Sequence, residues 1–242
     1  MTNFKEIKAN TYEDMSNEAA TIIFDALKES KQFSLGLATG STPEGMYDAL
    51  AKKINEANLD LSELTTFNLD EYVGLDESND QSYHYFMEQH FFSKLDIPQE
   101  NIHILDGVAE DLQKEVEDYE ALIDEVGIDI QVLGIGRNGH IAFNEPGTDF
   151  NSLTHKVQLT DETIEDNSRF FESIEDVPTE AVSMGLQTIM KAKTIILLIS
   201  GDNKKNARDL FISGEVTEDI PVSILHNHDN VILITDSAAR GE

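Results

Sequence analysis

Short apolar runs alternate with amphipathic stretches along almost the whole chain, and this alternation limits its fold more than any other feature. The pattern is typical of repeated strand–helix units, in which helices connect neighbouring parallel strands. Residues 195–199 are all Ile or Leu, and a strand without polar residues indicates a sheet that is covered on both faces. We therefore predict an α/β fold, a single Rossmann-like domain over residues 1–242 with a largely parallel sheet and helices on both faces.

The apolar runs bounded by Gly, Asp or Asn are the predicted strands, at residues 33–38, 64–69, 101–105, 128–135, 194–200 and 230–235. The amphipathic stretches are the predicted helices, at residues 12–29, 43–57, 82–95, 109–126, 179–192 and 204–213. Pro43 suits the first turn of its helix, where its missing N–H group costs nothing. Residues 139–169 are rich in Asn, Thr and Asp and are predicted to be an irregular excursion from the sheet.

The charge balance limits the partners that this chain can bind. It has 17 Lys and Arg residues against 47 Asp and Glu residues, which gives a formal net charge of −30. A charge of this sign argues against nucleic acid or an anionic membrane as a partner. With 40% hydrophobic and 26% charged residues, the composition is that of a soluble globular protein.

Other features of the sequence concern the compartment and the chemistry. The chain has no cysteine, which excludes disulfides, thiolate metal sites and cysteine nucleophiles. Residues 1–6 show no basic region followed by an apolar run, and nowhere do about 18 apolar residues run together. We therefore expect a cytoplasmic protein without a membrane-spanning segment.

Small polar residues follow the first predicted strand, at the edge of the sheet where open parallel sheets bind ligands. Thr39, Gly40, Ser41 and Thr42 lead directly into a predicted helix. Their N–H groups, their hydroxyls and the helix N-terminus would hold a phosphate without a basic residue. The alternative is an ordinary turn with a Ser or Thr cap. No Lys follows in the Walker position, so a nucleotide P-loop is disfavoured.

Two adjacent carboxylates, Asp70 and Glu71, follow the second predicted strand. Carboxylates at a strand end can act as a general base or bind Mg²⁺. In a chain with 47 acidic residues, such a pair is also typical of a solvated surface.

The fourth predicted strand leads into a glycine-rich loop that carries a histidine. The glycines that match the dinucleotide pattern G-x-G-x-x-G are Gly134, Gly136 and Gly139. That interpretation needs a helix to begin here, and Pro146 makes a long helix improbable, so we reject it. The loop instead presents His140 close to Asn138 and Glu145, which could orient the imidazole for proton transfer. The alternative is a structural histidine that bonds the loop backbone.

Few cations are available to bind an anionic substrate. The arginines are Arg137, Arg169, Arg208 and Arg240. Lys204 follows the fifth predicted strand, and Lys204 and Arg169 are the candidates for holding an anion. A solvated position on the surface is the alternative for both.

The other histidines carry weaker signals. His84, His90 and His103 are interpreted as helix-face or packing residues. His226 and His228 form an H-x-H pair that could chelate a metal, but no further ligands accompany them, and we predict no metal site.

Three motifs, in this order along the chain, resemble the glucosamine-6-phosphate deaminase (isomerase) family. They are L-A-T-G-S-T-P at 37–43, F-N-L-D-E-Y-V-G-L at 67–75 and G-I-G-R-N-G-H-I-A-F-N-E-P at 134–146. The likeness continues through N-S-R-F-F at 167–171 and G-D-N-K at 201–204. The related 6-phosphogluconolactonases share the fold but typically carry G-H-T-A-S-L-F-P in the histidine loop, so lactone hydrolysis is the alternative activity. A sugar-phosphate sensor would need an attached DNA-binding segment, which this sequence lacks.

The resemblance implies an isomerising deamination of glucosamine 6-phosphate to fructose 6-phosphate and ammonia, in amino-sugar breakdown and without a metal or organic cofactor. His140 would open the sugar ring, oriented and polarised by Asn138 and Glu145. Asp70 would move the proton from C2 to C1, and water would hydrolyse the resulting imine. The expected substrate-binding residues are Thr39, Gly40, Ser41, Thr42, Glu71, Gly139, Arg169 and Lys204, with the turn at 40–42 and the two cations on the phosphate.

The chain departs from the family pattern at two places. Some members carry Asp at the position of Asn138, and Asn can orient an imidazole but cannot stabilise an imidazolium by charge. The larger hexameric members bind N-acetylglucosamine 6-phosphate as an effector through basic residues, and the stretch 152–158 mostly lacks these cations, while the sequence stops at Glu242. We therefore expect a monomer or small homo-oligomer that this effector does not regulate.

Overall fold

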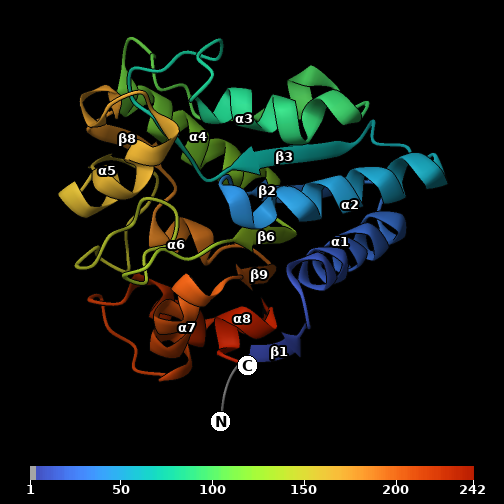
Figure 1. Ribbon diagram of the computed structural model, residues 1–242. Helices are drawn as coiled ribbons and strands as arrows, with labels where there is room; N and C mark the ends of the chain where they lie inside the picture. The colour runs from blue at the N-terminus through green and yellow to red at the C-terminus, as the bar shows by residue number, and fades with distance from the viewer. Residues whose placement is uncertain (1–3) are drawn as a thin grey trace.

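The computed structural model describes residues 4–242, and its centre is a parallel sheet (Figure 1). Within these residues the sheet has seven strands, and all neighbouring strands in it pair in parallel. Across the sheet the order is β1 (Phe4–Lys8), β10 (Val231–Thr235), β9 (Thr194–Ile199), β6 (Ile130–Leu133), β2 (Phe33–Leu37), β3 (Leu64–Asn68) and β5 (Ile102–His103). The predicted α/β class and largely parallel sheet are therefore confirmed.

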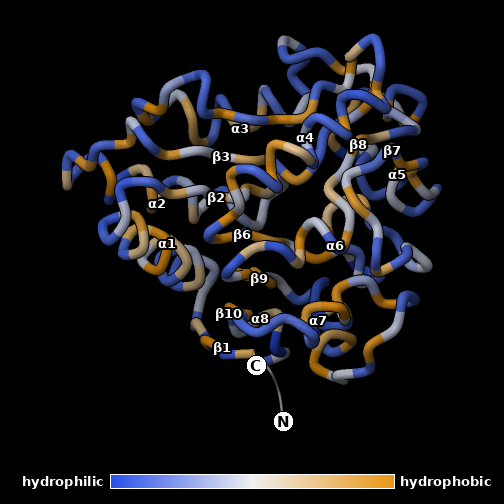
Figure 2. Tube along the Cα trace, turned by 180° about the vertical axis from the view of Figure 1, so that it is seen from behind, coloured by the Kyte–Doolittle hydropathy of each residue, from blue (hydrophilic) through white to orange (hydrophobic). Residues whose placement is uncertain are grey.

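Helices cover both faces of this sheet, as β9 illustrates. Ile195 and Leu197 pack into a hydrophobic cluster on one face, whereas Ile196 and Leu198 pack into a cluster on the other. The helices of the first cluster are α4 (Leu112–Val126), α6 (Leu186–Ile189), α7 (Lys205–Ile212) and α8 (Ser237–Arg240). The helices of the second are α1 (Tyr12–Glu29), α2 (Ser41–Ala57) and α3 (Tyr83–His90). Figure 2 shows the hydrophobic residues concentrated along the central strands.

A second, antiparallel sheet adjoins the carboxyl end of β3. In the described part of the chain it consists of β4 (Asp70–Tyr72), β8 (Glu180–Ser183) and β7 (His155–Gln158), with β8 in the middle. Leu69 links the two sheets, because its N–H donates to the carbonyl of Leu37 and its own carbonyl accepts from the N–H of Met184. The helix α5 (Asp161–Asn167) follows β7 and lies beside this sheet (Figure 1).

Some predicted elements differ from the structure. The helix predicted at 179–192 is wrong, because residues 180–183 form β8 between β4 and β7, and only α6 is helical. Residues 139–169 contain β7 and α5, so this segment is more regular than predicted. The strand β1 escaped prediction because a charged edge strand has no apolar run.

Of the amino-terminal stretch discussed above, residues 1–3 lie outside the described residues. No helix among residues 4–242 combines the length and the apolar character needed to cross a bilayer.

Candidate active site

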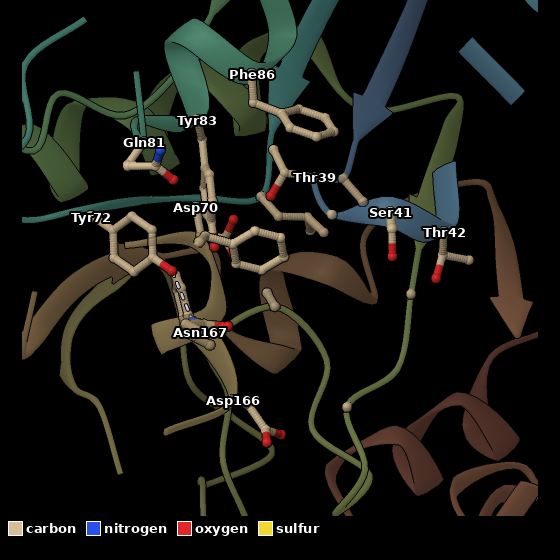
Figure 3. Close-up of a pocket in the computed structure, with 18 of the residues that line it drawn as sticks. Thr39, Ser41, Thr42, Asp70, Tyr72, Gln81, Tyr83, Phe86, Asp166 and Asn167 are labelled. Atoms are coloured by element: carbon tan, nitrogen blue, oxygen red, sulfur yellow. Dashed lines mark hydrogen bonds between the residues drawn. The ribbon is translucent and has the colours of Figure 1, made fainter. Parts of the chain in front are cut away.

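A pocket of about 420 Å³ lies at the carboxyl ends of the central strands (Figure 3). The loops after β2, β3 and β6 form its floor, and α3, α5 and the following 3-10 turn (Ser168–Phe170) contribute its walls. This is the edge at which the sequence predicted a ligand site.

One end of the pocket is the N-terminus of α2. Thr39, Gly40, Ser41 and Thr42 all line it, and Gly40 is the N-cap with a φ of 95°, a backbone conformation that favours glycine. No side chain of the described residues caps this helix, so the alternative of an ordinary Ser or Thr cap does not apply. The free N–H groups and the hydroxyls of Ser41 and Thr42, drawn in Figure 3, can therefore meet an anion.

Two cations face the same pocket. The half-buried Lys204 donates from Nζ to the carbonyl of Ile135 at 2.9 Å. Burial lowers the pKa of Lys204; the charge of Asp166 opposes this shift, while those of Arg169 and Arg137 add to it. Arg169 lies over the ring of Phe170, 4.6 Å from its centroid, and also lines the pocket.

The other arginines are engaged elsewhere. Arg137 forms an ion pair with Asp166 of α5. Arg208 bonds Glu6 at 3.0 Å, and Arg240 bonds Glu242 and backbone carbonyls. Lys204 and Arg169 are therefore the predicted cations that the fold brings to the pocket.

Asp70, the first residue of β4, presents its carboxylate to the pocket (Figure 3). It is 7% exposed, and no hydrogen bond from residues 4–242 reaches its carboxylate. Burial, and then the negative charge of Glu71, raise the pKa of Asp70 to about 8. A carboxylate in this state is a much stronger base than one in water.

Glu71 does not line the pocket, in contrast to the prediction that it binds substrate. Its side chain is 0% exposed and lies on the side of β4 that faces away from the pocket. Its carboxylate accepts hydrogen bonds from the N–H groups of Tyr72, Tyr83 and His84 and lies 2.8 Å from Nδ1 of His84. His84, interpreted above as a packing residue, is therefore the partner of a buried acid.

His140 is held by a chain of hydrogen bonds that leaves its Nε2 for the pocket. Its Nδ1 donates to Oδ1 of Asn138 at 2.8 Å, and Nδ2 of Asn138 donates to Oε2 of Glu145 at 2.9 Å. Thr163 of α5 donates to the other oxygen of Glu145. Burial favours the neutral form of Glu145, but its contact with His140 and these hydrogen bonds outweigh burial and lower the pKa of Glu145.

The loop glycines have different functions from those of a dinucleotide site. A Cβ on Gly136 would lie 2.1 Å from the ring of His140, so only glycine fits beneath the imidazole. Gly139 does not line the pocket; its carbonyl accepts from the N–H of Val222. No helix begins in this loop, in agreement with the rejection of the nucleotide interpretation.

The pocket also has an aromatic wall near Asp70, which the sequence did not predict. Tyr72, Tyr83, Phe143 and Phe171 pack together and line the pocket, and Asn167 donates to the hydroxyl of Tyr72 at 2.8 Å (Figure 3). These residues come from four separate segments, so no local pattern indicates the cluster.

The residues that the structure describes contain no group of three or more His, Asp or Glu side chains that could hold a metal ion. The H-x-H pair serves the backbone instead: Nε2 of His226 and Nε2 of His228 lie 2.7 Å from the carbonyls of Phe211 and Ala192.

Comparisons with known proteins agree with this geometry. A family profile described as "Glucosamine-6-phosphate isomerases/6-phosphogluconolactonase" matches residues 6–234. A glucosamine-6-phosphate deaminase of Clostridioides difficile is 52% identical over 232 residues, which cover 96% of this chain and 93% of that protein. A glucosamine-6-phosphate deaminase of Shouchella clausii is 51% identical over 234 residues, which cover 96% and 95% of the two chains.

Solved structures give the same result. A structure described as a monomeric glucosamine-6-phosphate deaminase superposes with a TM-score of 0.96 at 46% identity, covering 98% of this chain and 99% of its own. A 6-phosphogluconolactonase of Thermotoga maritima superposes with a TM-score of 0.77 at 21% identity, covering 97% of this chain and 100% of its own. The second similarity extends to the fold alone.

Proposed function

This chain belongs to the family of glucosamine-6-phosphate isomerases and 6-phosphogluconolactonases, and we propose that it is a glucosamine-6-phosphate deaminase. The observation that carries the proposal is the pairing of two acid–base groups in one pocket. Asp70 is a nearly buried carboxylate without a hydrogen-bond partner among the described residues, and His140 has its Nδ1 occupied and its Nε2 free for the pocket. Isomerisation of a sugar needs one such group for ring opening and one for the transfer between C2 and C1.

The phosphate is held at the N-terminus of α2. The N–H groups and hydroxyls of residues 39–42 surround it, and Lys204 and Arg169 supply the positive charge that the helix end alone cannot. Binding at this end fixes C1 and C2 relative to Asp70, which turns proton transfer into an intramolecular step.

Ring opening is the task of His140. With Nδ1 protonated and donating to Asn138, Nε2 is unprotonated and accepts the proton of the anomeric hydroxyl. The same nitrogen returns the proton to the ring oxygen as the C1–O5 bond breaks. Asn138 and Glu145 hold the imidazole in this tautomer.

Asp70 then acts on the open chain. Its carboxylate takes the proton from C2, and the C1 oxygen takes up a proton from water as the enolamine forms. Asp70 returns its proton to C1, which leaves a protonated imine at C2. Water adds to this imine, ammonia departs, and fructose 6-phosphate remains, without a covalent bond to the protein.

The relatives also support a small assembly, because the structure at 46% identity is described as monomeric. We propose a monomer or small homo-oligomer, which sedimentation equilibrium would measure directly.

The test is to incubate the purified protein with glucosamine 6-phosphate and to measure ammonia and fructose 6-phosphate together. Equal amounts of both products are expected, with the Asp70→Asn variant as the inactive control. A protein that hydrolyses 6-phosphogluconolactone and releases no ammonia from glucosamine 6-phosphate would instead establish the lactonase alternative.

The same assay tests the absence of a metal from the chemistry. We expect full activity in EDTA with no added cofactor, because the proposed steps use side chains and water alone. Loss of activity on chelation and its return with a divalent ion would contradict the mechanism.

A further inference from the structure

Glu71 is a buried ionisable group that the proposed mechanism does not use, although it is the immediate neighbour of Asp70. Successive side chains of a strand point to opposite faces, so Asp70 and Tyr72 line the pocket while Glu71 points away from it. A buried carboxylate is costly unless donors surround it. The hydrogen-bond donors around Glu71 are therefore what stabilises its buried carboxylate.

The backbone donors to Glu71, among residues 4–242, come from its own strand and from the start of α3. The N–H groups of Tyr72 and Tyr83 donate to Oε1 at 2.8 and 3.0 Å, and that of His84 donates to Oε2 at 3.0 Å. The first N–H groups of a helix lack partners within it, and its N-terminus favours negative charge. Glu71 thus ties the strand that carries Asp70 to the helix that carries Tyr83, another residue of the pocket.

The side chain of His84 also contacts the Glu71 carboxylate, on the side nearer the protein surface. Its Nδ1 lies 2.8 Å from Oε2 of Glu71, and its side chain is 26% exposed. The imidazole therefore connects a fully buried carboxylate with the surface. The pair carries one negative charge while the imidazole is neutral and none when it is protonated.

We propose that Glu71 and His84 form a charge pair behind the pocket that positions Asp70 and sets how strongly Asp70 holds its proton. The proposal rests on the proposed function, in which Asp70 is the base at C2. Both are positioning residues, since neither lines the pocket.

Glu71 is the charged group that acts on Asp70 in addition to burial. The ionisable groups beside Asp70 or Glu71 are Tyr72 of β4, Tyr83 and His84 of α3, and Tyr119 of α4. The other ionisable residues that line the pocket are Glu44, Asp80, Tyr85, His90, His140, Asp166, Arg169 and Lys204. Burial raises the pKa of Tyr72, Tyr83 and Tyr119, so they are neutral in the working range. The direction of the Asp70 shift agrees with this geometry, because burial and then Glu71 raise its pKa.

The test is the pH dependence of kcat/KM, whose acid limb reports the base of the free enzyme. Glu71→Gln removes the negative charge beside Asp70, which should move the acid limb down by about one pH unit or more. The matched control is Glu120→Gln, because Glu120 is also a buried carboxylate, bonded by Thr154, Thr188 and Lys191. Its acid limb should coincide with that of the unaltered protein.

A second pair of variants leaves Glu71 unaltered. These variants test the proposal even if the Glu71→Gln protein does not fold. His84→Leu removes the Nδ1 donor and leaves the charge less neutralised, so the acid limb should move up. In His84→Asn, the side-chain amide nitrogen can occupy the place of Nδ1, and this variant should return the limb towards that of the unaltered protein.

The outcomes are distinguishable. A folded Glu71→Gln variant whose acid limb matches the unaltered protein would overturn the proposal, as would His84→Leu and His84→Asn profiles that coincide. The unaltered protein alone tests the proposed function, which fails if no ammonia is released from glucosamine 6-phosphate. The charge pair is tested by the shifts of the acid limb between variants of a protein that does release ammonia.

Discussion

Gly136→Ala should move His140 without altering any group that takes part in proton transfer. A Cβ at this position would lie 2.1 Å from Cε1, 2.2 Å from Nε2 and 2.3 Å from Nδ1 of the His140 ring. Ordinary contact begins near 3.4 Å, so the imidazole must shift by more than 1 Å. That shift breaks the 2.8 Å bond to Asn138 and moves Nε2 from the position facing the pocket.

The expected loss follows from this displacement. A misplacement of about 1 Å can cost roughly 10²-fold in rate, so kcat/KM for deamination should fall by about that factor. The loss should be smaller in the reverse direction, since the acyclic fraction of fructose 6-phosphate needs no ring opening. Exchange of its C1 proton with D₂O in the presence of ammonium, followed by NMR, measures that half of the reaction.

Gly134→Ala is the matched control for the position of the ring. A Cβ at Gly134 would meet no atom within 4 Å, so the imidazole NMR signals of His140 should stay in place, while those of Gly136→Ala should move. A Gly136→Ala protein that deaminates within twofold of the unaltered rate would refute the assignment of ring opening to a precisely placed His140.

Further predictions concern Asp70 and the phosphate end of the pocket. Asp70→Asn should lower turnover by about 10²–10⁴-fold while the ligand still binds; substantial C1 exchange by this variant, with none by His140→Gln, would mean that the two functions are reversed. Lys204→Met and Arg169→Met should each raise KM by roughly 10- to 150-fold, the equivalent of a lost charged hydrogen bond of about 1.5–3 kcal/mol; unchanged kinetics at low substrate would place the phosphate elsewhere. The pKa of Asp70 is about 8 in the fold, raised from its ordinary value of 3.8, so the native state binds the Asp70 proton more tightly than the unfolded chain does. The free energy of unfolding that this proton contributes is fully present below the unfolded pKa and is lost as pH rises through 8. Asp70→Asn should therefore raise the midpoint of urea unfolding relative to the unaltered protein more at pH 9 than at pH 6; an equal difference at both values would contradict the shift.

The sequence predicted those parts of the fold that depend on local pattern. The Ile and Leu run of β9 is buried on both faces, as its composition indicates. The family and the fold class are confirmed, and the fold brings Asp70, His140 and residues 39–42 to one pocket. These positions could be predicted because each lies in the segment that follows a strand of the parallel sheet.

Features that depend on contacts between residues far apart in the sequence could not be predicted from it. Residues 180–183 have a spacing that also suits a helix, and only their pairing with β4 and β7 makes them a strand. Glu71 and His84 are 13 positions apart, and no periodicity relates a strand residue to the first turn of the following helix. Glu71 does not line the pocket beside Asp70, because adjacent side chains on a strand face opposite ways.

The link at Leu69 determines how this protein can lose activity. Its N–H belongs to the hydrogen bonding of the central sheet and its carbonyl to that of the second sheet, with Asp70 as the next residue. Opening of the second sheet alone releases the Leu69 carbonyl and displaces Asp70, while the hydrophobic clusters on the central sheet stay intact. Heat inactivation can therefore precede the loss of helical circular dichroism, and hydrogen exchange at the Met184 amide reports on the catalytic end of a molecule that is otherwise still folded.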